Sequence, residues 1–182
     1  LKCRECFCPE MSCSICAHAA GHKGPVLWED MLWTVVHKRP PCGVVGHLML
    51  ISKRHFQGPS AFTDNEAATV GLALRRCERA LEEVTKCDRV YTAALGSAAA
   101  PHFHAHMIPV YKDAGPVGEP ARSVSCTPFD VFLQEKLAKD GAVIADAAQC
   151  ESVARAFAAA MAAHDPPSAA AAASTAAEPP AA

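Results

Sequence analysis

The residues most able to do chemistry are three histidines that alternate with apolar residues. They lie in the segment His102-Phe103-His104-Ala105-His106-Met107-Ile108. In a β-strand, successive side chains point to opposite faces, so the three imidazoles would share one face at a spacing of about 6.6 Å. Phe103, Ala105 and Met107 would then face the core. Because imidazole can act as nucleophile, acid, base or metal ligand near neutral pH, this strand is the first candidate for a functional site.

Cysteines are the second group of candidate residues. The chain has ten, and five crowd its first 16 residues: Cys3, Cys6, Cys8, Cys13 and Cys16. Two thiolates in a Cys-x-x-Cys pair can hold one tetrahedral zinc ion, whose remaining positions suit imidazole. Cys13 and Cys16 could therefore combine with histidines from later segments, or with Cys3 and Cys6 in a four-cysteine site. We favour the mixed site, because the histidine strand and the segment around His47 and His55 supply nitrogens.

Length and composition restrict the class of protein. A chain of 182 residues suits one domain with a real core. The formal net charge of −2 argues against a surface that binds nucleic acid by neutralising many phosphates. No apolar run reaches the roughly 18 residues of a transmembrane helix, and residues 1–4 lack the apolar core of a signal peptide. We therefore expect a protein of a reducing compartment, cytoplasmic with the nucleus as a second location, that makes no membrane contact.

Hydrophobic patterns predict the elements that position these side chains. The expected strands cover residues 26–28, 33–36, 47–52 and 89–95, followed by the histidine strand, which ends near Tyr111. Thr63 and Glu66 form a capping box that opens the strongest helix, to about Lys86, with Cys77 on its apolar stripe. A short helix is expected from Thr127 and a longer one over 146–164.

The same patterns divide the chain into four parts. We expect an irregular cysteine-rich segment over 1–23, a core over 24–112, a helical extension over 113–164 and a disordered Ala/Pro-rich tail over 165–182.

The histidine strand matches the His-φ-His-φ-His-φ-φ signature of the histidine triad superfamily, where φ is apolar. The preceding segments are also similar, in order, to the zinc-containing branch of that superfamily: Cys13-x-x-Cys16, Trp28-Glu29-Asp30, Gly46-His47, Lys53-Arg54-His55 and then the long helix. The resemblance covers about residues 13–112. It implies an α+β fold, a mainly antiparallel sheet with the long helix packed across it, to which this chain would add C-terminal helices.

The resemblance also implies an activity. Members of this superfamily hydrolyse or transfer nucleoside monophosphates, acting on nucleotide phosphoramidates, dinucleoside polyphosphates or related adenylylated compounds, and they commonly form homodimers. By position, His104 matches the nucleophile, and His47 and His106 match the histidines that contact the phosphate. The zinc ligands of the branch fall on Cys13, Cys16, His55 and His102. Four protein ligands leave zinc no open position, so this metal would be structural.

Other parts of the site depart from the family pattern. Many relatives carry glutamine or serine just before the first histidine, where this chain has Ala98-Ala99-Ala100-Pro101. Ser97 is the nearest hydroxyl, and backbone N–H groups near Gly96 and Ser97 could stabilise charge on the phosphate. No acidic residue that would hold the ribose is evident, and His37 is the closest polar candidate. Ser52 stands where a proline is usual.

These departures leave several functions to weigh. A transferase acting on hexose phosphates would be expected to have glutamine in place of His106. A DNA-repair deadenylase would need a nucleic-acid-binding extension, and the C-terminal tail has no basic cluster. The main alternative of another class is a nucleotide-binding or zinc-stabilised interaction module with little turnover, which the alanine-rich loop favours.

Overall fold

Five strands form a single antiparallel sheet in a computed structural model that describes residues 13–21, 24–38, 44–95, 101–111 and 145–164. In sheet order the strands are β1 (Val26–Glu29), β2 (Trp33–His37), β3 (Leu48–Ser52), β5 (His104–Val110) and β4 (Arg89–Ala93). The helices in this part of the chain are α1 (Ser14–Ala19), the 3-10 turn η1 (Pro59–Ala61), α2 (Asp64–Thr85) and α4 (Ala147–His164). The expected α+β fold, with an antiparallel sheet and a long helix, is confirmed.

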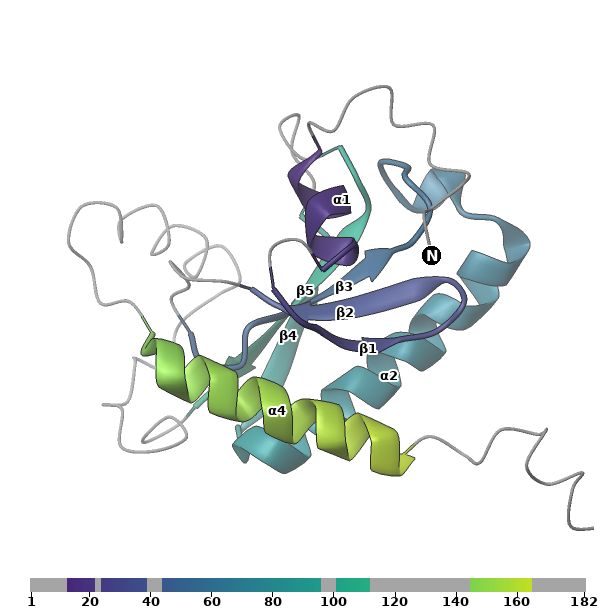
Figure 1. Cartoon of the computed structure of the whole chain (residues 1–182). Helices are drawn as coiled ribbons and strands as arrows, with labels where there is room; N and C mark the ends of the chain where they lie inside the picture. The colour runs from purple at the N-terminus through teal and green to yellow at the C-terminus, as the bar shows by residue number, and fades with distance from the viewer. Residues whose placement is uncertain (1–12, 22–23, 39–43, 96–100, 112–144, 165–182) are drawn as a thin grey trace, which may run out of the picture.

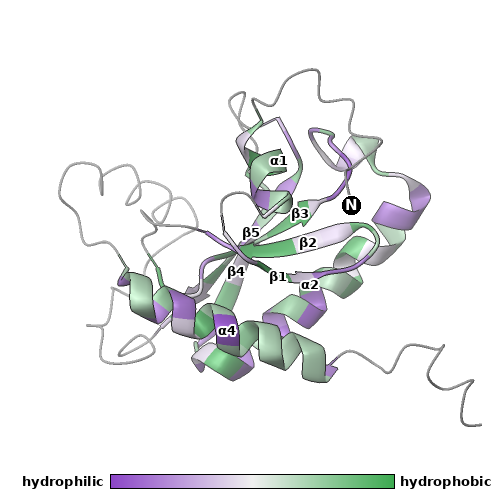
Figure 2. Ribbon diagram, in the orientation of Figure 1, coloured by the Kyte–Doolittle hydropathy of each residue, from purple (hydrophilic) through white to green (hydrophobic). Residues whose placement is uncertain are grey.

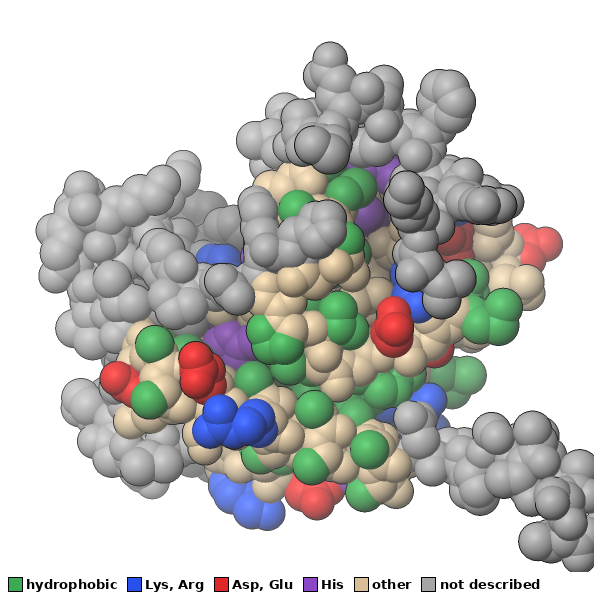
Figure 3. All heavy atoms as spheres, in the orientation of Figure 1, with side chains coloured by type: hydrophobic (Ala, Val, Ile, Leu, Met, Phe, Trp, Pro, Cys, Tyr) green, Lys and Arg blue, Asp and Glu red, His purple; other side chains and the backbone are tan. Residues whose placement is uncertain are grey.

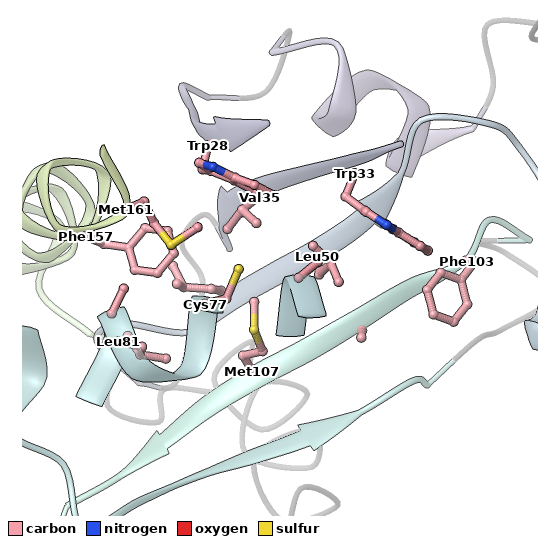
Figure 4. Packing of buried hydrophobic residues seen from close by; sticks show 14 of the residues in the cluster. Trp28, Trp33, Val35, Leu50, Cys77, Leu81, Phe103, Met107, Phe157 and Met161 are labelled. Atoms are coloured by element: carbon pink, nitrogen blue, oxygen red, sulfur yellow. The ribbon is translucent and has the colours of Figure 1, made fainter. Parts of the chain in front are cut away.

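The helices cover the two faces of the sheet unequally. Figure 1 shows α2 and α4 on one face and the short α1 on the other. The α2–α4 face holds the larger core, where Trp33, Leu50 and Met107 of the sheet pack with Cys77 of α2 and Phe157 of α4 (Figure 4). Cys77 is fully buried there, as expected of a small core residue.

Helix α2 is organised by its ends and by one apolar face. The expected capping box is present: the Thr63 hydroxyl accepts from the Glu66 N–H, and the Glu66 carboxylate accepts from the Thr63 N–H. The helix ends at Lys86, which adopts a left-handed conformation with φ +53°. Figure 2 shows hydrophobic and hydrophilic residues alternating along α2, as expected of a helix with one buried face.

Two expectations about local structure were wrong. Residues 14–19 are helical, not irregular, because the Cys13 sulfur caps the helix N-terminus and Ile15 is buried against the sheet. The ladder of β5 begins at His104, not at His102, because the Phe103 N–H donates to the Phe56 carbonyl of the preceding turn.

Some expectations fall on residues outside the described ranges. They include the metal role of Cys3, Cys6 and Cys8, the helix from Thr127 and the tail over 165–182. Among the residues that are described, no helix is both long and apolar enough to cross a membrane.

Candidate functional site

Strand β5 places two of the three histidines on the α1 face of the sheet. His104 pairs with Ile51, and His106 pairs with Met49 on the neighbouring β3. Ile51 and Met49 pack against α1, whereas Ala105 and Met107 lie in the larger core on the opposite face. The alternation expected from the sequence is therefore present, and every residue of β5 is buried.

A second cluster lies at the N-terminal end of this strand. Two thiols and two imidazoles from three segments converge there: Cys13, Cys16, His55 and His102. Their candidate ligand atoms all lie within 4.8 Å of one another. The Sγ atom of Cys16 is 3.2 Å from Nδ1 of His102 and 3.3 Å from Nδ1 of His55. The Sγ atom of Cys13 is 3.9 Å from Nδ1 of His102.

These distances fit a tetrahedral zinc ion. With Zn–S near 2.3 Å and Zn–N near 2.0–2.1 Å, sulfur and nitrogen ligands on one ion are about 3.6 Å apart. The observed separations bracket that value. The donor set, two soft thiolates and two imidazoles, is one that zinc prefers. The residues present therefore fit the metal that the sequence predicted.

The ring of His102 is oriented by a partner on its far side. Its Nε2 atom lies 2.7 Å from the carbonyl oxygen of Ser52 and 3.2 Å from the Ser52 hydroxyl. An Nε2–H that donates to this carbonyl leaves the Nδ1 lone pair facing the thiols, as a metal ligand requires. The Ser52 hydroxyl in turn donates to the Arg54 carbonyl at 2.8 Å and lies 3.3 Å from the Phe103 carbonyl. Ser52 thus connects the segments that carry His55 and His102.

His55 is held in place by the residue before it. The Arg54 guanidinium contacts the Glu66 carboxylate through two nitrogens, at 3.1 and 2.6 Å, and packs over the Phe56 ring. Glu66 is only 2% exposed. Burial raises the pKa of Glu66, but hydrogen bonds from Arg54 and Thr63 outweigh it, so the pKa lies below its ordinary value. The sequence predicted the role of Glu66 in the helix capping box but did not predict its ion pair with Arg54.

The central histidine has one ring nitrogen engaged by the main chain. Its Nδ1 lies 2.7 Å from the His102 carbonyl oxygen, so Nδ1–H donates and Nε2 carries the lone pair. Burial lowers the pKa of His104, and the bond to His102 opposes that shift only in part. A buried neutral imidazole of this tautomer is a competent nucleophile through Nε2.

The other two candidate histidines contact each other. Nε2 of His47 lies 2.9 Å from Nδ1 of His106, and the ring of His106 also packs edge-on against His104. Burial is the largest cause that lowers the pKa of His106, and together with the nearby charges of His47, His104 and Lys38 it brings the value to about 2. His47, His104 and His106 thus form one buried group beside the metal cluster. On the face of the molecule drawn in Figure 3, histidine side chains reach the surface beside α1 and again above α4.

His37, expected near a ribose, has both ring nitrogens engaged by the main chain. Its Nδ1 lies 2.6 Å from the Lys38 carbonyl oxygen, and its Nε2 accepts from the Gly46 N–H at 3.1 Å. Burial lowers the pKa of His37 to about 4, which keeps the accepting nitrogen unprotonated. Contact with a nucleotide stays a prediction for this residue, and its ring would have to offer a face or a carbon edge. Gly96 and Ser97 lie outside the described residues.

Comparisons with known proteins come from structure. The sequence matches no protein-family model and no curated protein. A hypothetical histidine triad nucleotide-binding protein from Sulfolobus tokodaii strain 7 is 17% identical, with a TM-score of 0.61 over 83% of this chain and 93% of that one. A zinc-bound histidine triad family protein from Mycobacterium smegmatis is 22% identical, with a TM-score of 0.55 over 84% and 95%. A uridylyltransferase is 16% identical, with a TM-score of 0.58 over 85% of this chain and 46% of that one.

These similarities define the class of the fold. It is the fold of the histidine triad superfamily, and the resemblance predicted from the histidine strand is confirmed at that level. The zinc bound to the Mycobacterium smegmatis protein is compatible with the Cys/His cluster seen in this chain.

Proposed function

We propose that this chain is a nucleotide hydrolase or nucleotidyl transferase that works through a nucleotidyl-histidine intermediate on His104. The observation that carries the proposal is the bond of 2.7 Å between Nδ1 of His104 and the His102 carbonyl. It fixes the tautomer in which Nε2 can attack phosphorus. The imidazole of His106 packs edge-on against the attacking ring, and Nε2 of His47 lies 2.9 Å from Nδ1 of His106.

The reaction divides into two displacements at the α-phosphorus. In the first, Nε2 of His104 forms a bond to phosphorus, and the bond from phosphorus to the leaving group breaks. The electron pair stays on the leaving atom, which takes a proton. In the second, water attacks phosphorus and gives up a proton, and the N–P bond breaks with its electron pair returning to Nε2. The nucleoside monophosphate then leaves with neutral His104 restored, and the released proton balances the one taken by the leaving group. A neutral imidazole suits the first step because an anionic phosphate repels hydroxide. His47 and His106 would stabilise charge on the phosphate oxygens, together with backbone N–H groups near Gly96 and Ser97.

The Cys/His cluster would hold one structural zinc. Bound by Cys13, Cys16, His55 and His102, the ion would have no open coordination position and would fix α1 and the turn after β3 against the start of β5. The ion would contribute to catalysis indirectly, by fixing the His102 carbonyl that accepts the hydrogen bond from Nδ1–H of His104.

The substrate would be a small nucleotide, a phosphoramidate, a dinucleoside polyphosphate or a related adenylylated compound, and the working form a homodimer. The alternative function is a nucleotide-binding or zinc-stabilised module with little turnover. It is favoured by Ala98, Ala99 and Ala100, which stand where many relatives carry a side chain able to donate a proton.

Turnover separates the two functions. The full chain, loaded with zinc, is incubated with an adenosine phosphoramidate and, separately, with a diadenosine polyphosphate, and AMP is measured by chromatography. We expect AMP from the wild type, none from His104→Ala, and wild-type rates from His164→Ala, a histidine at the exposed end of α4. Tight nucleotide binding without AMP release would favour the binding module.

A further inference from the structure

Ser52 lies at the junction of the two segments that bring the histidines into the Cys/His cluster. It is the last residue of β3 and is fully buried. Its N–H donates to the Phe103 carbonyl at 3.3 Å, and the Phe103 N–H donates to the Phe56 carbonyl at 2.6 Å. The turn that carries His55 and the segment that carries His102 are therefore joined by two main-chain hydrogen bonds.

The Ser52 hydroxyl adds side-chain bonds to this junction. A hydroxyl has one proton to donate and two lone pairs that can accept. The proton best serves the Arg54 carbonyl at 2.8 Å, because the Phe103 carbonyl lies further away at 3.3 Å. Since Nδ1 of His102 faces the thiols, its Nε2 carries the proton and shares it between the Ser52 carbonyl at 2.7 Å and the Ser52 hydroxyl at 3.2 Å. The hydroxyl thus links the main chain just before His55 to the ring of His102.

Both histidines that this hydroxyl links are candidate metal ligands. Their Nδ1 atoms lie 3.3 Å (His55) and 3.2 Å (His102) from the Sγ atom of Cys16, and the centroids of their rings are 4.8 Å apart. A ligand ring that can turn or shift must be ordered when the metal binds, and that ordering costs entropy. A hydrogen-bonded partner behind the ligand removes part of this cost, because it fixes the ring before the metal arrives.

The identity of the residue at this position matters for these bonds. The N–H and the hydroxyl of Ser52 each make a hydrogen bond at the junction. A proline, which is usual at this position in similar chains, has neither group. The hydroxyl is therefore a feature of this chain, and alanine at the same position would keep both main-chain groups and lose the hydroxyl alone.

We propose that Ser52 is a positioning residue of the Cys/His cluster, and that its hydroxyl sets the zinc affinity by holding His55 and His102 in the orientation that the metal needs. The inference rests on the proposed function, since it takes the cluster to hold zinc. Ser52 is not one of the four candidate ligands and acts only through the two histidines. Loss of this hydroxyl should therefore weaken zinc binding although all four ligands are still present.

The test measures the zinc dissociation constant of the full chain, by competition with a chelating dye at constant pH. Ser52→Ala removes the hydroxyl, Ser52→Thr keeps it, and Cys13→Ser shows the signal left when one ligand is lost. Thr34→Ala is the matched control, because this hydroxyl on neighbouring β2 is also fully buried but has no hydrogen-bond partner among the described residues. Met161→Ala, in the larger core, controls for a loss of stability alone.

A second measurement replaces zinc by cobalt(II). The visible absorption of cobalt(II) reports the geometry of its ligands, so it separates a displaced ligand from a general loss of stability. Destabilisation elsewhere in the fold would leave these absorption bands unchanged, whereas a turned His55 or His102 ring would alter them.

The expected result is a selective loss of zinc affinity. Ser52→Ala should raise the zinc dissociation constant by about 10- to 100-fold, the usual effect of losing a residue that orients metal ligands, and should alter the cobalt(II) bands. Ser52→Thr, Thr34→Ala and Met161→Ala should each change the dissociation constant by less than about 3-fold and leave the bands as in the wild type.

Several outcomes would overturn the inference. They are a zinc dissociation constant for Ser52→Ala within about 3-fold of the wild type, an equal rise in Thr34→Ala or Met161→Ala, and a wild type that binds no zinc. If Ser52→Ala does not fold, proton NMR of the zinc-loaded wild type decides: a Ser52 hydroxyl proton that exchanges slowly with water supports the inference, and rapid exchange overturns it. AMP release is measured separately, so a failure of the proposed catalysis is distinguished from a failure of this inference.

Discussion

Nδ1 of His104 lies 2.7 Å from the carbonyl oxygen of His102, and the ring of His102 itself faces the thiol of Cys16. A single residue therefore contributes its side chain to the Cys/His cluster and its main chain to the central histidine. The position of the His104 ring, which we propose attacks phosphorus, depends on the same peptide segment that the metal would fix. Metal loss should consequently affect turnover as well as stability, although the metal has no place in the bond-forming step.

Replacing Cys13 by serine should remove the metal. We expect one zinc per chain in the wild type and in Cys3→Ser, and much less in Cys13→Ser, by elemental analysis of the dialysed proteins. The thermal midpoint should fall with the metal, because binding energy at a structural zinc site is also folding energy. Equal loss of zinc from Cys3→Ser and Cys13→Ser would instead support the four-cysteine site.

The Arg54–Glu66 pair should stabilise the fold in a pH-dependent way. Arg54→Met leaves a buried carboxylate without its cation and should cost about 2 kcal/mol of unfolding free energy at pH 7. The folded-state pKa of Glu66 is lowered, so its stabilising contribution is complete above about pH 4.5 and is lost as the pH falls through the folded-state value. The free energies of urea unfolding of the wild type and of Glu66→Gln should therefore differ at pH 7 and converge as the pH falls below about 4.5. A gap that widens on acidification contradicts this assignment.

Gly46 should be intolerant of any side chain. It has φ +82°, and an added Cβ would lie 3.2 Å from Pro109 and 3.3 Å from Thr85. Gly46→Ala should cost about 1–3 kcal/mol from backbone strain alone, with crowding in addition. The matched control is Gly71→Ala in α2, where an added Cβ meets nothing within 4 Å. This substitution should stabilise the helix by about 0.5–1 kcal/mol, because alanine has a higher helix propensity than glycine. Urea midpoints of the two variants should move in opposite directions, and a shift of the same sign in both would count against this account.

The features that could be predicted from the sequence are those encoded within a few consecutive residues. The histidine alternation and the Thr63–Glu66 cap are contained in a few consecutive residues, so both were visible in the sequence and are present in the structure. The resemblance to a known superfamily brought the distant Cys13 and His102 into one predicted cluster, which spacing alone would not have done.

What the sequence did not predict depends on tertiary contacts. Helix α1 is too short to form by propensity and depends on a sulfur cap and on burial of Ile15. The engagement of His37 by Gly46, and of Arg54 by Glu66, arises only when the turns around β3 are folded. The spacing of apolar residues along the chain does not predict such contacts. The sequence showed Ser52 only as a departure from a family pattern and did not predict its contacts with His102 and Arg54.

The covalent intermediate on His104 is the central claim, and intact-protein mass spectrometry tests it most directly. Wild-type protein is mixed with an adenosine phosphoramidate, quenched at short times in cold denaturant kept above neutral pH to preserve the N–P bond, and compared with His104→Ala and with His106→Asn. The account predicts a mass increase of one adenylyl group in the wild type, located by peptide mapping to His104 and absent from His104→Ala. AMP release by a folded His104→Ala protein at the wild-type rate, or an adenylyl group found on another residue, would contradict it.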